Sequence, residues 1–163
     1  MTATLTADPE AALTQGDHAS LRLWLRLYTC ATMVERTLDA ALKREFGSSL
    51  PRFDLLAQLH RAPKGLRMGE LSERILTTGG NVTWLVSALA REGLVQRRAD
   101  ITDRRAAVVR LTAAGRRHFL AMATAHETLI SQLLGGLTAS ERRTLYALLG
   151  TVKQHLRQER TAS

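Results

Sequence analysis

Hydrophobic side chains recur every three or four residues near both ends of the chain, a spacing that places them on one face of an α-helix. Between Ser20 and Phe46 the series is Trp24, Leu27, Ala31, Val34, Leu38, Ala41 and Leu42. Near the other end it is Leu145, Leu148, Leu149, Val152 and Leu156. The pattern predicts a long helix over 20–46 that ends before Gly47, and another from a Thr138–Glu141 capping box to about Glu159.

The middle of the chain predicts shorter elements. Pro51 begins a helix that reaches about His60, and Pro63-Lys64-Gly65 forms a turn. Two further helices are expected over 68–76 and from an N-cap at Thr78 to Arg91, the second ended by Gly93. Strand-like segments at 94–98 and 107–111 flank a tip at 99–105, and Thr112 caps a helix of about twenty residues that ends at Gly135-Gly136.

A helix, a turn, a second helix and a hairpin in this order form a winged helix-turn-helix. We therefore expect a mainly α fold: a winged helix-turn-helix with long N- and C-terminal dimerisation helices and a two-stranded β wing. The expected division is a flexible arm at 1–19, a helical dimerisation region at 20–50 and 113–163, and a DNA-binding lobe at 51–112.

Positive charge is concentrated in the predicted hairpin and its flanks. The net charge is +8, and residues 91–117 contain eight arginines against three acidic residues, a net charge of +5. The first twenty residues contain three acidic residues and neither lysine nor arginine. Because arginine makes paired hydrogen bonds to phosphates and guanine edges, this distribution predicts double-stranded DNA as the partner.

Other classes of protein are disfavoured. No nucleophile elbow, Walker loop or dinucleotide fingerprint is present, so we do not expect an enzyme. The five histidines and Cys30 show no metal-ligand spacing, so we expect neither a metal nor another cofactor.

A single cysteine excludes an internal disulfide, and no apolar run approaches the roughly 20 residues of a membrane span. We expect a soluble cytoplasmic protein without a membrane partner, and the N-terminus has no signal-peptide layout.

The helix before the hairpin carries the expected DNA contacts. Val82, Leu85, Val86 and Leu89 form its inward stripe and leave Asn81, Thr83, Trp84, Ser87 and Ala88 facing outward. Hydroxyl and amide groups in this set can bind base edges or phosphates, and the helix N-terminus at Thr78 and Gly80 favours a phosphate. For Trp84, packing on sugars and thymine methyls and packing back against the preceding helices are both open.

The wing supplies the second set of contacts. Arg104 and Arg105 stand at its tip, where a cation can enter a minor groove, and Asp103 can hold one guanidinium in place. Arg97 and Arg98 alternate along a strand, so only one of them can face DNA, and Arg97 is our candidate. The alternative for each residue is an ordinary solvated charge.

The long terminal helices predict a homodimer. A small winged core cannot bury the apolar faces of three such helices, and exposed apolar surface of that extent usually lies in an interface. A symmetric dimer is the commonest solution, and it suits two half-sites about one helical turn apart in a pseudo-palindromic operator.

The segments GNVTWLVSALAREGLVQRR and DRRAAVVRLTAAGRRHF closely resemble the MarR family of bacterial transcriptional regulators. The resemblance extends over the order of elements from Ser20 to Glu159. It implies a triangular helical dimer with two winged lobes, which acts as a repressor that a small, often aromatic, ligand releases. It also identifies Arg105 as the inserted wing residue. Two departures are a shortened wing motif at Ile101–Arg105 and a tryptophan at position 84.

An aromatic acid or its coenzyme A thioester is the effector that the resemblance suggests. Trp24, Tyr28 and His60 could line a pocket beneath the first helix, and Arg22, Arg26 and Arg52 could hold its carboxylate or phosphates. The alternative to a pocket is that the rings pack in the core and the arginines are solvated.

Apolar neighbours predict that Cys30 is buried and inert. A cysteine-based redox sensor and an architectural DNA-binding protein without a ligand remain the alternative functions.

Overall fold

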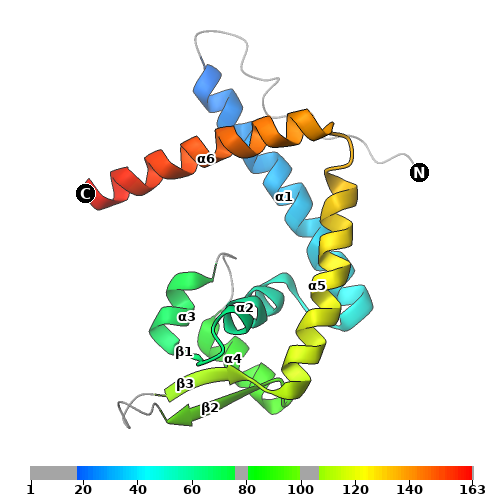
Figure 1. The fold of residues 1–163 in the computed structure, drawn as a ribbon, viewed down its shortest axis with the longest axis vertical. Coiled ribbons are helices and arrows are strands. Elements are labelled where there is room, and N and C mark those ends of the chain that lie inside the picture. Colours follow the sequence, from blue (N-terminus) through cyan, green and yellow to red (C-terminus); the bar gives the residue numbers. More distant parts are fainter. Residues whose placement is uncertain (1–17, 76–80, 100–106, 163) are drawn as a thin grey trace. The chain divides into compact units, whose positions relative to one another are not determined.

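The computed structural model describes residues 18–75, 81–99 and 107–162. Its elements occur in the order α1 (Ala19–Phe46), α2 (Leu50–Arg61), β1 (Leu66–Arg67), α3 (Met68–Arg74), α4 (Val82–Arg91), β2 (Val95–Ala99), β3 (Ala107–Leu111), α5 (Ala113–Leu133) and α6 (Ala139–Ala162) (Figure 1). The chain divides into two compact units, one through Glu127 and one from Thr128 onward. The mainly helical winged fold and the order of its elements are confirmed.

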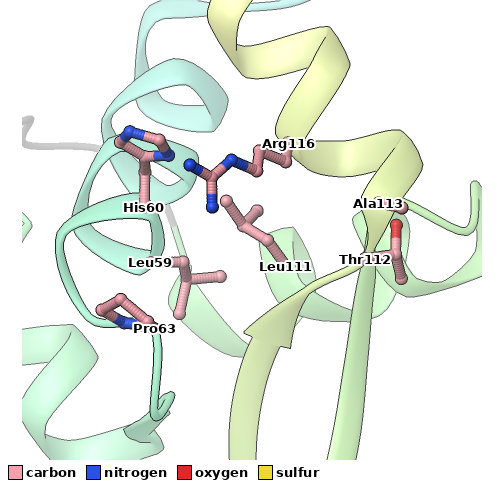
Figure 2. Close-up of a pocket in the computed structure, with 7 residues that line it drawn as sticks. All are labelled: Leu59, His60, Pro63, Leu111, Thr112, Ala113 and Arg116. Atoms are coloured by element: carbon pink, nitrogen blue, oxygen red, sulfur yellow. The ribbon is translucent and has the colours of Figure 1, made fainter.

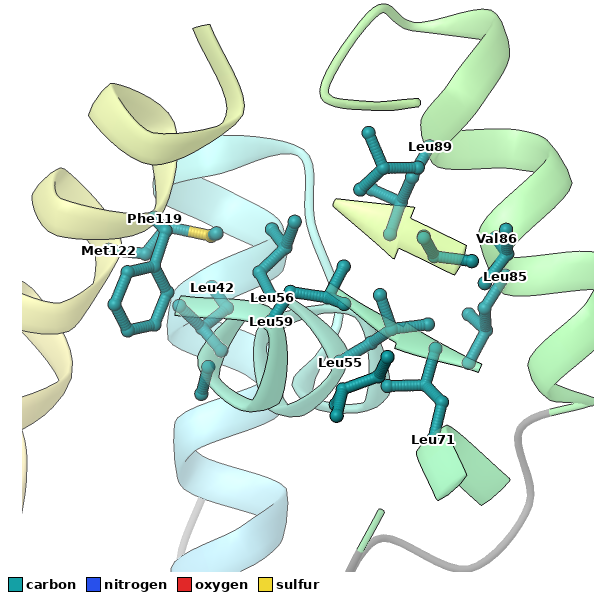
Figure 3. Packing of buried hydrophobic residues seen from close by; sticks show 14 residues of the cluster. Leu42, Leu55, Leu56, Leu59, Leu71, Leu85, Val86, Leu89, Phe119 and Met122 are labelled. Carbon is teal, nitrogen blue, oxygen red and sulfur yellow. The ribbon is translucent and has the colours of Figure 1, made fainter. Parts of the chain in front are cut away.

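The first unit is built around α2. Leu55, Leu56 and Leu59 on this helix are at most 2% exposed, because α1, α3, α4, the sheet and α5 all contribute to the same hydrophobic cluster (Figure 3). Its other fully buried side chains are Leu71, Val86, Leu89, Val109 and Met122. Burial of a leucine contributes about 1.5–3 kcal/mol, so this cluster holds the winged lobe together.

The C-terminal half of α1 belongs to this unit. Leu38 and Leu42 are buried in it, and the carboxylate of Asp39 accepts hydrogen bonds from the Leu50 backbone amide at 2.9 Å and from Lys43 at 2.6 Å. Burial acts to raise the pKa of Asp39, but these two donors outweigh it and lower the pKa below its ordinary value. The charged carboxylate therefore fastens the start of α2 to α1.

The expected two-stranded wing is present as β2 and β3, and β1 extends it to a three-stranded antiparallel sheet in the order β1-β3-β2. Leu66 pairs with Val109, and five residue pairs from Val95–Leu111 to Ala99–Ala107 join β2 to β3. The first strand was missed because it has two residues, too few for an alternating pattern. Leu66 is nevertheless 3% exposed, so this strand joins the core to the wing.

The junction of the sheet with α5 follows the predicted caps. Gly93 has a φ of 71°, and its left-handed conformation turns the chain from α4 into β2. The Thr112 hydroxyl donates to the Gly93 carbonyl at 2.7 Å and accepts from the Gly115 amide at 3.0 Å. Thr112 thus caps α5 and also holds the base of the wing, as the sequence predicted for the cap.

In the second unit, α6 begins with the predicted capping box. The Thr138 amide donates to the Glu141 carboxylate at 2.7 Å, and the Glu141 amide donates to the Thr138 hydroxyl at 3.2 Å. Hydrogen bonds from Thr138 lower the pKa of Glu141. Every residue from 139 to 159 is exposed, although the apolar series from Leu145 to Leu156 lies along one face. No helix in the described residues is both long and apolar enough to cross a membrane.

Candidate nucleic-acid interface

The two faces of α4 differ sharply. Leu85, Val86 and Leu89 are at most 3% exposed and pack into the core, whereas Trp84 is 60% exposed and Thr83 is also exposed. The inward stripe is confirmed for these three leucine and valine positions, and Val82 is half-buried. The outward assignment of Ala88 is wrong. This residue is 7% exposed. Its side chain is small enough to be buried next to Leu89, where α4 packs closely against its neighbouring elements.

Asn81, not Thr78, caps α4. The Asn81 side-chain oxygen accepts a hydrogen bond from the Trp84 backbone amide at 3.1 Å, and the helix begins at Val82. An asparagine before the first helical residue satisfies a backbone donor that would otherwise lack a partner. The cap was misplaced by three residues because threonine and asparagine are both strong N-cap residues. Asn81 therefore fixes the first turn of α4, the turn that also presents Trp84.

A hydrogen bond joins the outward face of α4 to the sheet. Arg97 on β2 donates to the Ser87 hydroxyl at 3.1 Å, and Ser87 itself is half-buried. Arg98 instead hydrogen-bonds Gln96 at 3.3 Å, and these two residues share the other face of the strand. Arg97 is thus the arginine of the pair on the side of α4, and it places a cation beside Ser87.

Five predicted site residues lie outside the described residues. They are Thr78 and Gly80 before α4, and Asp103, Arg104 and Arg105 between β2 and β3.

The predicted effector residues fall into separate groups. Trp24 and Tyr28 lie on the N-terminal half of α1, with ring centroids 5.7 Å apart, and both are more than half exposed. Arg22 and Arg26 are exposed on the same half of the helix. Arg52 forms an ion pair with Glu92 at the end of α4, with only 17% of its side chain exposed. That pair joins α2 to α4.

His60 lines a cleft of about 180 Å³ between the end of α2 and the start of α5 (Figure 2). Leu59, Pro63, Leu111, Thr112, Ala113 and Arg116 form the rest of its lining. The Arg116 guanidinium extends from α5 toward the His60 imidazole, and none of these lining residues is acidic. The cleft therefore combines apolar walls with groups that attract an anion.

His60 is the first of four aromatic rings in a row. Its imidazole packs on Phe119 at 4.7 Å between centroids, Phe119 on Phe53 at 5.5 Å, and Phe53 on His126 at 4.5 Å. Burial lowers the pKa of His126, so the far end of the row is neutral at neutral pH. The row joins α2 to α5 and fixes one wall of the cleft.

Arg116 was missed as a candidate, and Cys30 was misjudged. Arg116 becomes recognisable only when α5 is packed beside the end of α2, and no local motif signals that approach.

Cys30 is exposed, so the expected burial is wrong for this chain. Apolar neighbours at helical spacing predicted an inward position, but the N-terminal half of α1 extends beyond the core. Among the described residues, no group of three His, Cys, Asp or Glu side chains could hold a metal ion.

The exposed outer face of α4, the basic strand beside it and the three-stranded sheet define a winged helix-turn-helix protein of the DNA-binding class. Residues 46–106 match the model of the MarR family. A crystal structure of a MarR family transcriptional regulator from Silicibacter pomeroyi is 32% identical, with a TM-score of 0.73, and the match covers 86% of this chain and 99% of that one. The chain therefore belongs to the MarR family.

Two further relatives support this assignment. Sco3205, a MarR family regulator from Streptomyces coelicolor whose crystal structure contains DNA, is 26% identical, with a TM-score of 0.75 and coverage of 88% of this chain and 91% of that one. The transcriptional activatory protein BadR from Rhodopseudomonas palustris is 33% identical over 97 residues, which span 58% of this chain and 55% of BadR. The chain is a DNA-binding transcriptional regulator and not an enzyme.

Proposed function

We propose that this regulator acts in the cytoplasm as a homodimeric repressor of a pseudo-palindromic operator, and that a small aromatic acid or its coenzyme A thioester releases it. The outward face of α4 carries the proposal. Thr83 and Trp84 are exposed on it, and Asn81 fixes its first turn. Arg97, which donates a hydrogen bond to Ser87, adds a positive charge to this face. A helix of this kind fits the major groove.

The wing would contact the DNA beside that groove. We propose that Arg105 inserts into the minor groove with Arg104 beside it, that Asp103 orients one guanidinium, and that Thr78 and Gly80 approach a phosphate. The support is the net charge of +5 over residues 91–117 and the antiparallel pairing of β2 with β3, which brings the two ends of the 100–106 connection together.

The dimer would form through the helices at both ends of the chain. On α1, Leu23 and Trp24 are more than half exposed, and on α6 Leu148 and Leu156 are as well. We propose residues 20–50 and 113–163 as the dimerisation region and 51–112 as the DNA-binding lobe. Such apolar faces are stable in water when a second copy covers them.

Repression is the simplest consequence of a dimer that covers an operator, whereas activation needs an additional contact with the transcription machinery. The name of BadR describes an activator, so the sign of regulation requires its own assay. A reporter placed behind the operator should increase its expression when the regulator is deleted. Decreased expression on deletion would identify an activator and leave the DNA-binding proposal intact.

Removal of the wing arginines tests the mode of DNA binding. Arg104→Ala/Arg105→Ala should weaken operator binding by about 1–3 kcal/mol for each arginine that enters a groove. If Arg97 binds a phosphate, Arg97→Ala should reduce the salt dependence of DNA binding. The slope of the logarithm of the binding constant against the logarithm of the salt concentration should become smaller by about 1. Fluorescence anisotropy at several salt concentrations measures both effects. Arg142→Ala/Arg143→Ala removes the same charge from α6, and equal losses in the two double variants would contradict the wing assignment.

We propose the cleft at His60 and Arg116 as the place where an effector acid binds. Its apolar walls would hold a ring, and Arg116 would hold the carboxylate. The cleft lies where β3 leads into α5, so a ligand that prefers one arrangement of this junction would change the position of the winged lobe. A preference of about 2.7 kcal/mol would lower DNA affinity roughly a hundredfold. Trp24, Tyr28, Arg22 and Arg26 remain candidates for contacts with a coenzyme A moiety, and Arg52 for a supporting role.

A titration of a preformed protein–operator complex tests this effector. Benzoates, cinnamates and their coenzyme A thioesters should include a compound that releases DNA, and Arg116→Ala should raise the concentration required by about tenfold or more, because a hydrogen bond to a charged group contributes about 1.5–3 kcal/mol. Arg117→Ala, which removes the neighbouring exposed charge, should leave release unchanged.

Other results of the same titration would identify the alternatives. Cys30 is exposed, so release by peroxide that is lost in Cys30→Ser would identify a redox sensor. If neither acids, thioesters nor peroxide change DNA binding, the regulator is an architectural protein without an effector.

A further inference from the structure

Among the described residues of the proposed DNA-binding lobe at 51–112, Trp84 is the one large apolar side chain that is exposed. It is 60% exposed, whereas Leu85 and Val86, the next two residues along α4, are 3% and 0% exposed. A tryptophan left in water on a well-packed helix forgoes the burial of one of the largest apolar surfaces in proteins. Such a side chain fits a surface that becomes covered when a partner binds.

The first turn of α4 holds Trp84 in a defined position. Its backbone amide donates to the Asn81 side chain at 3.1 Å, and the buried Leu85 and Val86 fix the rotation of the helix. Ser87, one turn further along the same face, accepts the hydrogen bond from Arg97. Trp84 therefore lies one helical turn from the serine that binds a cationic side chain, on the face proposed to enter the major groove.

The major groove offers one apolar group to such a side chain. Guanine, cytosine and adenine present hydrogen-bond donors and acceptors along this edge, whereas thymine also presents its 5-methyl group. We propose that Trp84 selects a thymine in each half-site by packing its indole against that methyl group. This inference rests on the proposed entry of α4 into the major groove, and it identifies the chemistry of one base that the helix reads.

Operator duplexes with uracil in place of thymine provide the test. The replacement removes only the methyl group and keeps the base pair, and each thymine of a duplex selected from a random pool is replaced in turn. At one position in each half-site, wild-type affinity should fall about fourfold, which corresponds to about 0.8 kcal/mol for one methyl-sized group. Trp84→Ala should bind thymine and uracil duplexes equally at that position, and Trp84→Phe should keep part of the difference.

Matched variants make the result decisive. Thr83→Ala changes the neighbouring exposed residue and should keep the full uracil penalty at the Trp84 position. Thermal unfolding should confirm that Trp84→Ala is folded, because the side chain that it removes is exposed.

Several results would overturn the inference. One is a wild-type protein that is insensitive to every uracil, and another is a penalty that persists in Trp84→Ala. If Trp84→Ala weakens binding to all duplexes alike, the indole packs on the sugar-phosphate backbone and this inference fails while the proposed function stands. If the wild type selects no DNA sequence from the pool, the proposed function fails together with it.

Discussion

Replacing Gly115 by Ala is expected to destabilise the first unit by about 1–3 kcal/mol or more, the usual cost of excess volume in a packed core. A Cβ at this position would lie 1.9 Å from the carbonyl oxygen of Leu94 and 2.8 Å from its carbonyl carbon. Both are backbone atoms at the entrance to β2, so a side-chain rotation cannot relieve the clash. Either α5 or the wing must move, and urea unfolding measures the loss.

Gly69 provides the control for this substitution. It lies in α3, and an added Cβ there would meet no atom within 4 Å. Gly69→Ala should therefore stabilise the protein by roughly 0.5–1 kcal/mol through the helix propensity of alanine. If both variants unfold at the same urea concentration, the close approach of α5 to Leu94 does not contribute to stability as inferred.

The elements that were predictable are those whose signals are local. Long amphipathic repeats located α1 and α6, Gly93 marked the end of α4, and the Thr112 and Thr138 caps were correct because a cap depends on residues within one turn. The hairpin at β2 and β3 was also readable, because two short segments that contain valine and leucine flank a polar tip rich in arginine and aspartate.

Apart from the misplaced cap of α4, the errors concern features that depend on packing between distant segments. The two residues of β1 become a strand only because Val109 and Val108 on β3 lie beside them. Cys30 has the apolar neighbours of a buried residue, yet its part of α1 extends beyond the core. Arg116 joins His60 only when the start of α5 reaches the end of α2. Periodicity reports which face of a helix is apolar but not which partner covers that face.

The largest expected effect on DNA binding comes from two charges on the apolar face of α6. Leu148 and Leu156 are 61% and 58% exposed in the single chain, and their exposure is the reason to place a second copy against them. Leu148→Glu/Leu156→Glu should give a monomer. Burying two carboxylates without partners in a dimer interface raises the free energy by far more than the remaining apolar contacts of the interface lower it. A monomer binds one half-site at a time, so operator affinity should fall by about 10²–10⁴.

The opposite face of α6 supplies the control for this double variant. Ala147 and Gln154 are exposed about half a turn away from that apolar series, and Ala147→Glu/Gln154→Glu adds the same negative charge. Any general repulsion between the protein and DNA is therefore equal in the two double variants. Sedimentation equilibrium should show a monomer only for the leucine variant, and its affinity for an isolated half-site should remain close to that of the control. If the leucine variant remains dimeric with full operator affinity, the dimer forms elsewhere, and the apolar face of α6 needs another partner.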